Sequence, residues 1–586
     1  MAVLPQQVIK PARRVIRDPI LAITLVVIVL FVGVSIILPI FAMVRESLSE
    51  QGLSLFSRYL SETSYQTIIS NTVILGLAVA TLGTLIGFLF AYVQVKVRVP
   101  FKRFMHILAL VPIISPPFAL ASALIILFGR NGMILRGIFG TRCLWGSGRT
   151  CNDIYGLDGL TIVLALSLFT VAYLNLKGML EALDPALDEA ATNLGGSKWH
   201  IFRTVTVPML VPGIASSFLL LFVEAIADLG NPLVLGGNYE VLATRIYISV
   251  IGMYDTTAAA VLSVVLLVPS LTVFIVQRYW ISRATVVSVT GKPSGTPQQI
   301  THPLVCLPLF VLVMAVCLLI ILLYATIFVG AFTNVLGVDN TFTLKNFDFV
   351  INGYGSEAMV DTTTLSALAT PLAGIIGMII AFLVVRKSFA GRAALDFAAM
   401  LGIAVPGTIL GIGYLLMFNN DIQIMLPGIG PVTLIPKLTG GRAIFAGAAA
   451  IVLVYVVRSV PAALRSGVAL LTQIDPAIEE ASTSLGANSE QTFRHITLPL
   501  IRPAFLSGLI FAFARSMTTI SAIVFLTTPQ TRIMTAQILN EVENGRFGNA
   551  FAYCVILILI VLLTIGILYA AVGSTSGADR GLEGGA

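Results

Sequence analysis

Charged side chains are scarce in this sequence. Asp, Glu, Lys and Arg together make up 11% of its 586 residues, whereas 57% of the residues are hydrophobic. So little charge excludes an ordinary soluble globular protein and predicts a polytopic membrane protein that contacts a lipid bilayer. The 35 Lys and Arg outnumber the 28 Asp and Glu, but they are dispersed among short loops. We interpret this excess as a topology signal and expect no nucleic-acid partner.

Two kinds of active centre are missing from the sequence. It contains no GxxxxGK[ST] phosphate loop, so nothing in it supports ATP hydrolysis by the chain itself, and we expect it not to be an enzyme. Histidine is rare, with 4 residues, and neither His200 nor His495 has a second ligand beside it. We therefore expect no metal site and no cofactor bound by this chain.

Cysteine is also rare, with 5 residues in the chain. Cys306, Cys317 and Cys554 lie inside apolar runs, where they are expected to be small core residues. Cys143 and Cys151 differ, because they share one hydrophilic loop, RCLWGSGRTC. We expect that loop to lie outside the cytoplasm, where a disulfide between these two cysteines is the favoured prediction and two free thiols are the alternative.

Long hydrophobic runs are what the sequence has in abundance. Each is near the length of about 20 residues that a helix needs to cross the hydrocarbon core. The first run is too long for the core of a signal peptide and has no convincing cleavage site, so we expect it to remain as a span. Twelve spans are predicted, at residues 21–44, 72–95, 104–128, 160–176, 207–227, 258–276, 304–329, 364–385, 398–418, 443–460, 498–525 and 550–572.

The distribution of basic residues orients these spans. Clusters of Lys and Arg at 13–17, 96–103 and 386–392 all fall on one side of the predicted topology, and that side is expected to be cytoplasmic. Both termini are then expected to be cytoplasmic as well. The loop at 130–149 disagrees, because it places four Arg on the other side, although long loops follow the rule less strictly.

One polar stretch occurs twice. Residues 184–208 read DPALDEAATNLGGSKWHIFRTVTVP, and residues 475–499 read DPAIEEASTSLGANSEQTFRHITLP. In each copy an Asp is expected to cap a helix that begins at Pro, and a Gly is expected to end it. A second short helix then begins at Ser197 or Asn488 and leads into an apolar run. The sequence therefore predicts a polar helix-turn-helix between two spans, made twice.

The duplication extends beyond these loops. Upstream of them, Thr72 matches Thr362 and Gly87 matches Gly377, with an offset of 290 residues. This pattern predicts an all-α protein with two parallel six-helix repeats, related by a pseudo-two-fold axis along the membrane normal, and one central pathway between them. The predicted divisions are a first repeat at 1–277, a cytoplasmic linker at 278–303 and a second repeat at 304–586.

Both copies of the polar stretch carry the same short motif. Its residues are Glu189, Ala190, Ala191 and Gly195 in the first copy and Glu480, Ala481, Ser482 and Gly486 in the second. These stretches resemble the EAA loop of binding-protein-dependent ABC transporter permeases; the second copy departs from the first only in having Ser for the second Ala. The resemblance implies the type I ABC importer permease fold, in which these loops dock on ATP-binding subunits and transmit their motion to the spans.

The same resemblance implies partners for the chain. It implies two copies of an ABC ATPase subunit, which use the ATP, and an extracytoplasmic solute-binding protein that delivers the cargo. The location that it implies is a bacterial inner membrane, with the chain as a multi-pass permease.

The fused layout and the stretch FVEAIADLGNPLVLGGNYEVLATRIY at 222–247 resemble the ferric-iron type of importer permease. The resemblance implies import of ferric iron. Related permeases carry 2-aminoethylphosphonate, thiamine, sulfate, spermidine or sugar phosphates, which remain alternative cargoes. A secondary active transporter and a channel or assembly scaffold are the alternative classes. The scarcity of ionisable residues within the spans and the paired EAA loops favour the ABC permease.

Three ionisable residues mark a candidate translocation path. Glu224 and Asp228 share one helical face of the fifth span, and the offset of 291 residues matches Arg515 to Glu224. We expect an ion pair between the halves that acts as a gate; the alternatives are that each side chain is satisfied within its own half or faces water. Pro116 and Pro406 interrupt the third span of each half, either as a break that lines the path or as a structural kink.

Overall fold

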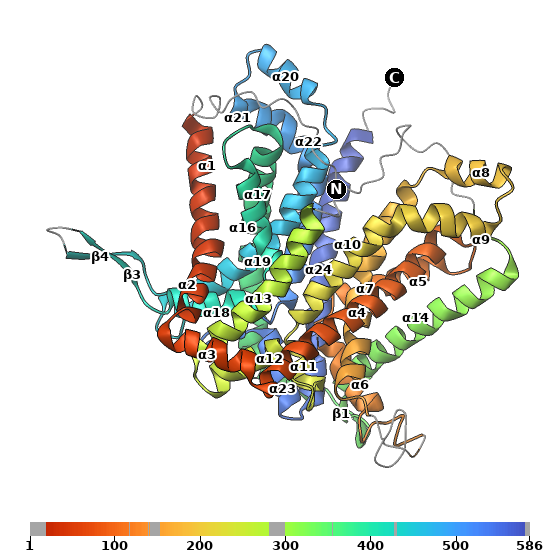
Figure 1. The fold of residues 1–586 in the computed structure, drawn as a ribbon, viewed down its shortest axis with the longest axis horizontal. Coiled ribbons are helices and arrows are strands. Elements are labelled where there is room, and N and C mark those ends of the chain that lie inside the picture. The colour runs from red at the N-terminus through yellow and green to blue at the C-terminus, as the bar shows by residue number, and fades with distance from the viewer. Residues whose placement is uncertain are drawn as a thin grey trace.

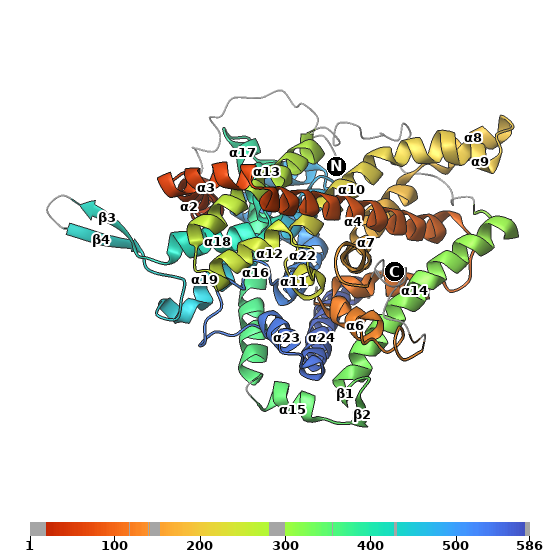
Figure 2. The same ribbon diagram turned by 60° about the horizontal axis from the view of Figure 1, so that its bottom comes forward.

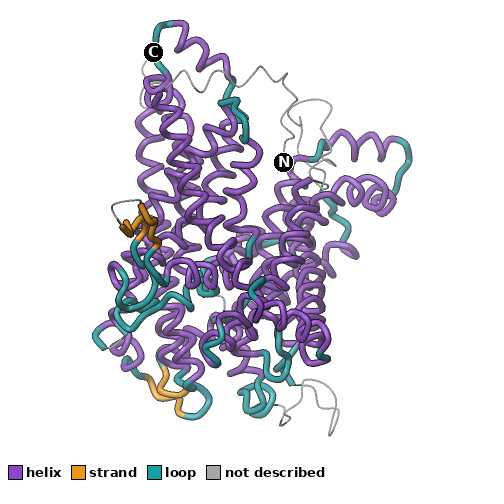
Figure 3. Tube along the Cα trace, turned by 60° about the vertical axis from the view of Figure 1, so that its left-hand side comes forward, coloured by secondary structure: helices purple, strands orange, loops and turns teal. Residues whose placement is uncertain are grey.

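Helices make up most of the described chain, which confirms the all-α class. The computed structural model describes residues 19–116, 118–138, 140, 153–279, 299–353, 355–426 and 430–580. Cys143 and Cys151 of the predicted disulfide lie outside the described residues, as do Pro117 and most of the predicted linker at 278–303. Strands occur in this described part as two small antiparallel hairpins (Figure 3), formed by β1 (Thr333–Val335), β2 (Asp339–Phe342), β3 (Ile422–Leu426) and β4 (Gly430–Ile435).

The described residues of the first repeat form thirteen α-helices with short π and 3-10 segments between some of them. They are α1 (Pro19–Val32), η2 (Gly33–Ile37), α2 (Leu38–Ser47), α3 (Glu50–Ser61), α4 (Thr63–Lys96), α5 (Lys102–Leu110), η3 (Val111–Ile113), α6 (Ala119–Phe128), α7 (Leu157–Ala182), α8 (Pro185–Asn193), α9 (Lys198–Ile201), η5 (Phe202–Thr206), α10 (Val207–Ile226), α11 (Gly230–Leu235), α12 (Leu242–Tyr247), η6 (Ile248–Gly252) and α13 (Thr256–Tyr279).

The second repeat follows the same order. Its helices are α14 (Pro303–Ala331), α15 (Lys345–Ile351), α16 (Ser356–Arg386), α17 (Arg392–Ala404), α18 (Gly407–Phe418), η8 (Ile444–Gly447), α19 (Ala448–Leu471), α20 (Pro476–Ser484), α21 (Ser489–Thr492), η9 (Phe493–Thr497), α22 (Leu498–Thr518), α23 (Met534–Glu543) and α24 (Phe547–Arg580).

Ten helical segments in the described part of the chain are long and apolar enough to cross a membrane. They correspond to ten of the twelve predicted spans, and Figure 1 shows some of them upright, such as α1 and α24, and others inclined, such as α4, α10 and α14. In that view α8 and α20 lie at the top, together with the beginning of α1 and the end of α24, whereas α6, α23 and β1 lie at the bottom. We call the end of the molecule that carries α8 and α20 the EAA-loop side.

The two remaining predicted spans, the third of each repeat, are broken helices, as the sequence predicts from Pro116 and Pro406. In the first repeat, α5, η3 and α6 take the place of one helix over 104–128. In the second repeat, α17 and α18 meet at a bend of 105° beside Pro406. The physical reason is that Pro has no backbone N–H and its ring clashes with the preceding turn, so a helix breaks there.

The first span of each repeat packs on the other repeat. The helices α1 and α2 contact α16, α17 and α18 of the second repeat, whereas α14 contacts α4, α5 and α6 of the first. Figure 2 shows both arrangements, with α2 beside α18 and α14 beside α6. Each of the two hydrophobic cores therefore contains residues from both repeats. The boundary between the sequence repeats does not coincide with a boundary between packed units.

Two glycines matched by the repeat let helices approach closely. A Cβ added at Gly87 of α4 would lie 2.7 Å from the Cβ of Ala172 in α7. The matching Cβ at Gly377 of α16 would lie 2.6 Å from the Cβ of Ala463 in α19. Small residues at such crossings allow backbone contact between membrane helices, which compensates for the missing hydrophobic driving force in lipid. The same close crossing is thus built into both repeats.

The contact between α18 and the first span has a hydrogen bond and a close approach. The Tyr414 hydroxyl donates to the carbonyl oxygen of Ser35 at 2.8 Å, and both residues are buried. One residue before Tyr414, a Cβ added at Gly413 would lie 2.6 Å from the carbonyl oxygen of Pro39. Because backbone atoms cannot swing aside as side chains do, even one methyl group has no room at Gly413.

We expect Gly413→Ala to loosen the docking of the first span on the second repeat. The added methyl group must push the backbone of Pro39 away, and overpacking of this kind costs about 1–3 kcal/mol. The measurement is the midpoint of thermal unfolding in detergent. Gly33→Ala is the matched control, since a Cβ at Gly33 of the same first span meets nothing within 4 Å. Equal unfolding midpoints for the two variants would contradict the expectation.

Candidate functional site

The two EAA loops form the helices that the sequence predicts. In α8 the Asp184 carboxylate accepts a hydrogen bond from the backbone N–H of Ala186 at 3.0 Å, and Asp475 accepts from Ala477 at 2.9 Å before α20. Gly195 follows the end of α8 with a φ of +83°, and Gly486 has a φ of +90° in the second copy. A side chain is strained at such a φ, which is why glycine ends each helix.

The second short helix of each loop leads into the fifth span without a break. In the first copy Ser197 caps α9, and α9, η5 and α10 together make one helical segment from Lys198 to Ile226. In the second copy the Asn488 and Gln491 side chains each accept from the other's backbone N–H, at 2.8 Å and 3.0 Å. A displacement of either loop is therefore passed directly to a membrane-spanning helix.

Each EAA loop presents one leucine side chain that is almost fully exposed. Leu194 is 89% exposed and its counterpart Leu485 is 90% exposed. Glu189, Ala190, Glu480 and Ala481 are also exposed. Leucine side chains so fully in water at the tips of two polar loops favour contact with another protein, because nothing in the described chain covers them.

Ser482 shows why the second copy departs from the motif. It is buried, and its hydroxyl lies 3.0 Å from the hydroxyl of Thr492. The matching positions of the first copy hold the apolar residues Ala191 and Ile201. Each copy has therefore kept a compatible pair at these two positions, polar in one loop and apolar in the other. The substitution belongs to the inner face of the loop and leaves its exposed face unchanged.

Two buried ion pairs, one in each repeat, hold the EAA loops against the second spans. Lys96 at the end of α4 contacts Asp188 of α8 at 2.6 Å, and Arg386 at the end of α16 contacts Glu479 of α20 at 3.1 Å. Arg386 also donates to the carbonyl oxygen of Ile474 at 2.9 Å. Sequence reasoning missed these pairs. The sequence did contain a signal for them: Lys96 and Arg386 are 290 residues apart, which is the offset between matched residues in this part of the two repeats.

The predicted ion pair between the two repeats is present in the structure. Nη2 of Arg515 in α22 lies 3.1 Å from Oε1 of Glu224 in α10. At about 1.5 Å per residue, Glu224 is roughly 24 Å along the helix from Pro208 at the start of the span, so the pair lies near the end of the fifth spans that is remote from the EAA loops. The Glu224 side chain is 23% exposed and that of Arg515 is 31% exposed. Both side chains therefore border a space instead of being sealed by packing.

Asp228 does not join this ion pair. Its carboxylate oxygen Oδ2 accepts two hydrogen bonds at 3.0 Å from Asn231, one from the backbone N–H and one from the side-chain amide. Burial raises the pKa of the Asp228 carboxyl to about 6, although these hydrogen bonds oppose that shift. Asp228 follows the membrane-spanning part of α10 and stabilises the start of α11. Its role is therefore to shape the turn after Glu224.

Arg458 is a third charged residue at this place that sequence reasoning missed. It lies in α19, is 8% exposed, and interacts electrostatically with both Glu224 and Arg515. Its Nη1 makes a long contact of 3.5 Å with the carbonyl oxygen of Val405, directly before Pro406. The break at Pro406 therefore lies beside the charged cluster of Glu224, Arg458 and Arg515.

The break at Pro116 has different surroundings. The residue before it, Ser115, accepts a hydrogen bond from the Tyr324 hydroxyl at 2.6 Å, and Tyr324 belongs to α14. The structure thus links Pro406 to the charged cluster and links Pro116 to the crossing first span of the other repeat. The two prolines, although matched in sequence, meet different neighbours.

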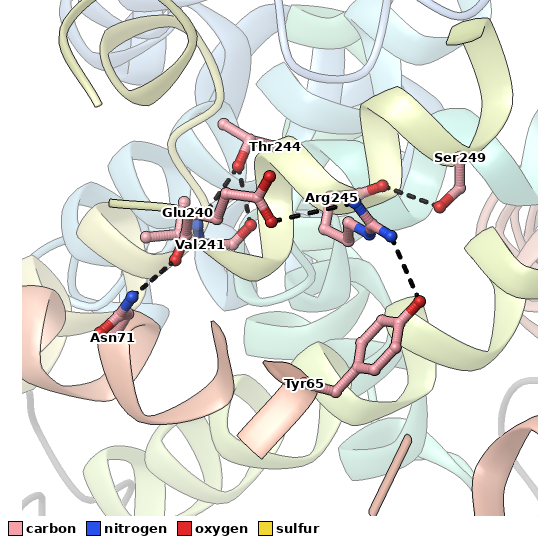
Figure 4. Close-up of polar contacts among 7 residues, drawn as sticks. All are labelled: Tyr65, Asn71, Glu240, Val241, Thr244, Arg245 and Ser249. Atoms are coloured by element: carbon pink, nitrogen blue, oxygen red, sulfur yellow. Dashed lines mark hydrogen bonds and ion pairs between the residues drawn. The ribbon is translucent and has the colours of Figure 1, made fainter. Parts of the chain in front are cut away.

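The segment after Glu224 is fastened to α4 on the side opposite the EAA loops. The Asn71 amide donates to the carbonyl oxygen of Glu240 at 3.1 Å, and Arg245 donates to the Tyr65 hydroxyl at 3.3 Å (Figure 4). The Thr72 hydroxyl oxygen accepts from the backbone N–H of Leu242 at 2.8 Å.

The second repeat makes the equivalent hydrogen bonds. The Thr362 hydroxyl oxygen accepts from the backbone N–H of Met534 at 2.7 Å, and Asp361 accepts from that of Arg532 at 3.0 Å. The threonines are the pair matched by the repeat. In both repeats, therefore, the chain after the fifth span is held against the second span, and the position of Glu224 and Arg515 is fixed from both ends of their helices.

A cavity of about 1430 Å³ opens on this side of the molecule. Its lining comes from both repeats and includes several polar side chains, among them Arg130, Asp153, Asp158, Asn238, Asn346, Arg546 and Asn549. Arg130 and Asp153 form an ion pair at 2.5 Å within it. Among the described residues, no three His, Cys, Asp or Glu side chains are grouped as metal ligands.

Comparison with known proteins identifies relatives for nearly the whole chain. The family model for the binding-protein-dependent transport system inner membrane component matches residues 83–286 and again 373–574. The chain is 34% identical over 531 residues to the ferric transport system permease protein FbpB of Actinobacillus pleuropneumoniae, covering 88% of this chain and 73% of that protein. It is 23% identical over 548 residues to the Fe(3+)-transport system permease protein FbpB 2 of Haemophilus influenzae, covering 91% and 96%. It is also 26% identical over 176 residues to the molybdenum transport system permease protein ModB of Escherichia coli, covering 28% and 71%.

We expect Lys96→Met to free α8 from α4. Removing one partner of a buried ion pair costs about 3–5 kcal/mol, because the other charge stays behind without compensation. Amide hydrogen exchange in α8 is therefore expected to accelerate more than tenfold, and the double variant Lys96→Met with Asp188→Met should recover part of the protection.

Lys177→Met is the control for that experiment. Lys177 pairs with Glu181 in α7 at 3.5 Å, and the Glu181 side chain is 54% exposed. An exposed pair of this kind contributes little, so exchange in α8 should stay at the wild-type rate. Equal protection of α8 in Lys96→Met and Lys177→Met would show that the ion pair does not hold the loop.

Proposed function

Because this chain belongs to the family of binding-protein-dependent transport system inner membrane components, we propose that it imports ferric iron across a bacterial inner membrane, with ATP hydrolysed by partner subunits. The chain is a multi-pass permease of an ABC importer. Ferric iron as the cargo is supported by the names of relatives that are similar over most of the chain. Its cargo is delivered by an extracytoplasmic solute-binding protein, and two copies of an ABC ATPase subunit bind the two EAA loops.

The observation that carries this proposal is the pair of EAA loops. Each is a capped polar helix with a glycine at positive φ and an exposed leucine at its tip, and each continues into a membrane-spanning helix. Neither a secondary transporter nor a channel needs two such loops. The residues that we assign to ATPase coupling are the motif positions Glu189, Ala190, Ala191, Gly195, Glu480, Ala481, Ser482 and Gly486, together with Leu194 and Leu485; of these, the buried Ser482 supports its loop from inside.

Transport then follows from rigid-body motion of the loops. When two ATP-bound subunits approach each other, they draw α8 and α20 together, and the ion pairs to α4 and α16 make the second spans follow. The fifth spans move as well, because they continue from α9 and α21. Their motion separates Glu224 from Arg515, and we assign this ion pair as a gate between the halves, with the Pro406 break beside it.

The placement of the chain in the membrane follows from the same assignment. ATPase subunits are cytoplasmic, so the EAA-loop side faces the cytoplasm. The beginning of α1 and the end of α24 lie on that side, which supports the proposal that both termini are cytoplasmic (Figure 1). The cavity lined by both repeats then faces the outside, where the solute-binding protein releases its cargo.

We expect Leu194→Asp combined with Leu485→Asp to abolish coupling. Each substitution places a charge in the apolar contact with an ATPase subunit without disturbing the fold, because both side chains are exposed. ATPase subunits should co-purify at less than a tenth of the wild-type amount, and uptake of ⁵⁵Fe into proteoliposomes should fall to the same extent.

The matched control carries Asn193→Asp and Ser484→Asp. These positions are also exposed, adjoin the two leucines and receive the same charge without losing an apolar side chain. The control should bind ATPase subunits and transport ⁵⁵Fe normally. Normal uptake by the leucine double variant would refute the coupling role of the loops.

We expect the ion pair between the repeats to tolerate an exchange of its charges. Glu224→Arg or Arg515→Glu alone places like charges together and should lower uptake of ⁵⁵Fe more than tenfold. The double variant restores opposite charges and should recover a clear fraction of that loss. Absence of any recovery would show that the two residues do not act as a direct pair during transport.

The cargo itself is tested by uptake driven by the purified binding protein. Proteoliposomes with the permease, its ATPase subunits and the binding protein should accumulate ⁵⁵Fe only when ATP is supplied inside the compartment that the EAA loops face. Failure to accumulate iron, with ATP still hydrolysed in response to the binding protein, would exclude ferric iron and keep the importer assignment.

A further inference from the structure

The charged cluster between the repeats contains hydrogen-bond donors that nothing in the described chain accepts. The Nε–H groups of Arg458 and Arg515 are both buried and both lack an acceptor among the described residues. Arg458 is 8% exposed as a residue, and its contact with the carbonyl oxygen of Val405 is long, at 3.5 Å. A buried donor left without a partner costs about 1–3 kcal/mol, and more for a charged group. Such donors can bond the oxygens of a ligand that enters the bundle.

The repeat makes this cluster unequal in charge. Position 167 of α7 corresponds to position 458 of α19, and it holds Ser167, whose hydroxyl donates to the carbonyl oxygen of Val163 at 2.9 Å. The first repeat therefore contributes Glu224 and a serine, whereas the second contributes two arginines. Asp228, the other acid nearby, is already bonded to Asn231. The two guanidinium groups thus face one carboxylate that is free to pair with them.

Two side chains of the cluster are partly exposed. Those of Arg515 and Glu224 are 31% and 23% exposed. Arginine inside a membrane protein is expensive unless it faces water or a partner, and this cost makes it a marker of a functional site. The geometry therefore places a partly exposed guanidinium, Arg515, beside a buried one, Arg458, on contacting helices.

The chemistry of the site favours an oxyanion over a bare metal ion. Two guanidinium groups repel a trivalent cation, and no three His, Cys, Asp or Glu side chains of the described residues come together to hold one. Guanidinium groups match the geometry of phosphate and carboxylate oxygens, and they form short charge-assisted hydrogen bonds with them. The Glu224 carboxylate already makes a contact of this kind with Arg515.

We propose that Arg458 and Arg515 form an oxyanion-binding site in the translocation path, which receives the phosphate or carboxylate oxygens of the cargo. This inference rests on the proposed role of the chain as an importer permease and specifies the form of the cargo. Either ferric iron passes with an oxyanion ligand still bound to it, or the oxyanion belongs to an organic solute that the permease carries in place of iron. A bare ferric ion has no place at this site.

Binding of phosphate to the intact transporter tests the site without any transport. The complex of the permease with its ATPase subunits, in lipid nanodiscs, is titrated with ³²P-labelled inorganic phosphate. We expect saturable binding that weakens at least tenfold in Arg458→Lys, which keeps the charge and loses the planar fork, and that disappears in Arg458→Met. The control Arg442→Gln also removes one arginine, but from an exposed position before α19, and should bind phosphate as the wild type does.

Two results of the titration would overturn the proposal. One is absence of phosphate binding by the wild type. The other is equal binding by the wild type and Arg458→Lys or Arg458→Met. Because Arg458→Lys keeps a positive charge at the buried position, it tests the site even where Arg458→Met fails to assemble.

A double-label uptake experiment separates the two sources of the oxyanion and separates this inference from the iron assignment. The binding protein is loaded with ⁵⁵Fe and ³²P-phosphate, and both labels are followed into proteoliposomes. Entry of both in a constant ratio assigns the oxyanion to an iron complex. Entry of ³²P alone keeps the oxyanion site and refutes iron as the cargo. Entry of ⁵⁵Fe alone, at an undiminished rate without phosphate or carboxylate ligands, refutes the oxyanion site and keeps the iron importer.

Discussion

Polar groups inside a membrane-spanning bundle must be satisfied by the protein itself, because lipid offers them no hydrogen bonds. The structure meets this constraint at three places where a helix departs from regular geometry. The π-helical segment in the first span exposes the Ser35 carbonyl, which accepts from Tyr414. Near the two breaks in the third spans, the Ala109 carbonyl accepts from Thr170 at 2.6 Å and the Val405 carbonyl meets Arg458. Each irregularity is thereby paired with a side chain from another helix, so the breaks are part of the packing.

The repeat separates what both halves share from what only one half has. The shared features are mechanical: the ion pairs that hold α8 and α20, the threonines that hold the chain after the fifth span, and the glycine crossings of the second and fourth spans. The features that differ lie at the centre, where Glu224 of one half pairs with Arg515 of the other, and Arg458 has only Ser167 as its counterpart in the repeat. Because both halves make the same mechanical contacts, they can move together. Because the charged residues at the centre differ between the halves, a single site there can recognise a ligand of one charge.

Much of this arrangement could be predicted from the sequence, and the rest could not for physical reasons. Hydrophobic runs located ten continuous helices, and the repeat offset predicted the match of Glu224 with Arg515, because both signals are local or periodic. Arg458 was not predicted because a single arginine in an apolar run forms no periodic pattern. The packing of each first span on the other repeat also left no local signal in the sequence, since an apolar helix packs equally well on either hydrophobic core. Only the folded chain decides which core it joins.

The packing of each first span on the other repeat affects how the permease moves. Because α14 packs on the first repeat and α1 and α2 pack on the second, each half carries a helix of the other on its outer side. Arg278 at the end of α13 also pairs with Asp396 of α17, which joins the halves near the EAA-loop side. Halves linked in this way cannot separate freely, so opening must occur by rotation about these contacts. A rotation of that kind changes the distance between the EAA loops and the distance between Glu224 and Arg515 in one motion. The coupling of ATP hydrolysis to the central site therefore requires no separate relay through the bundle, because the same rigid halves carry both.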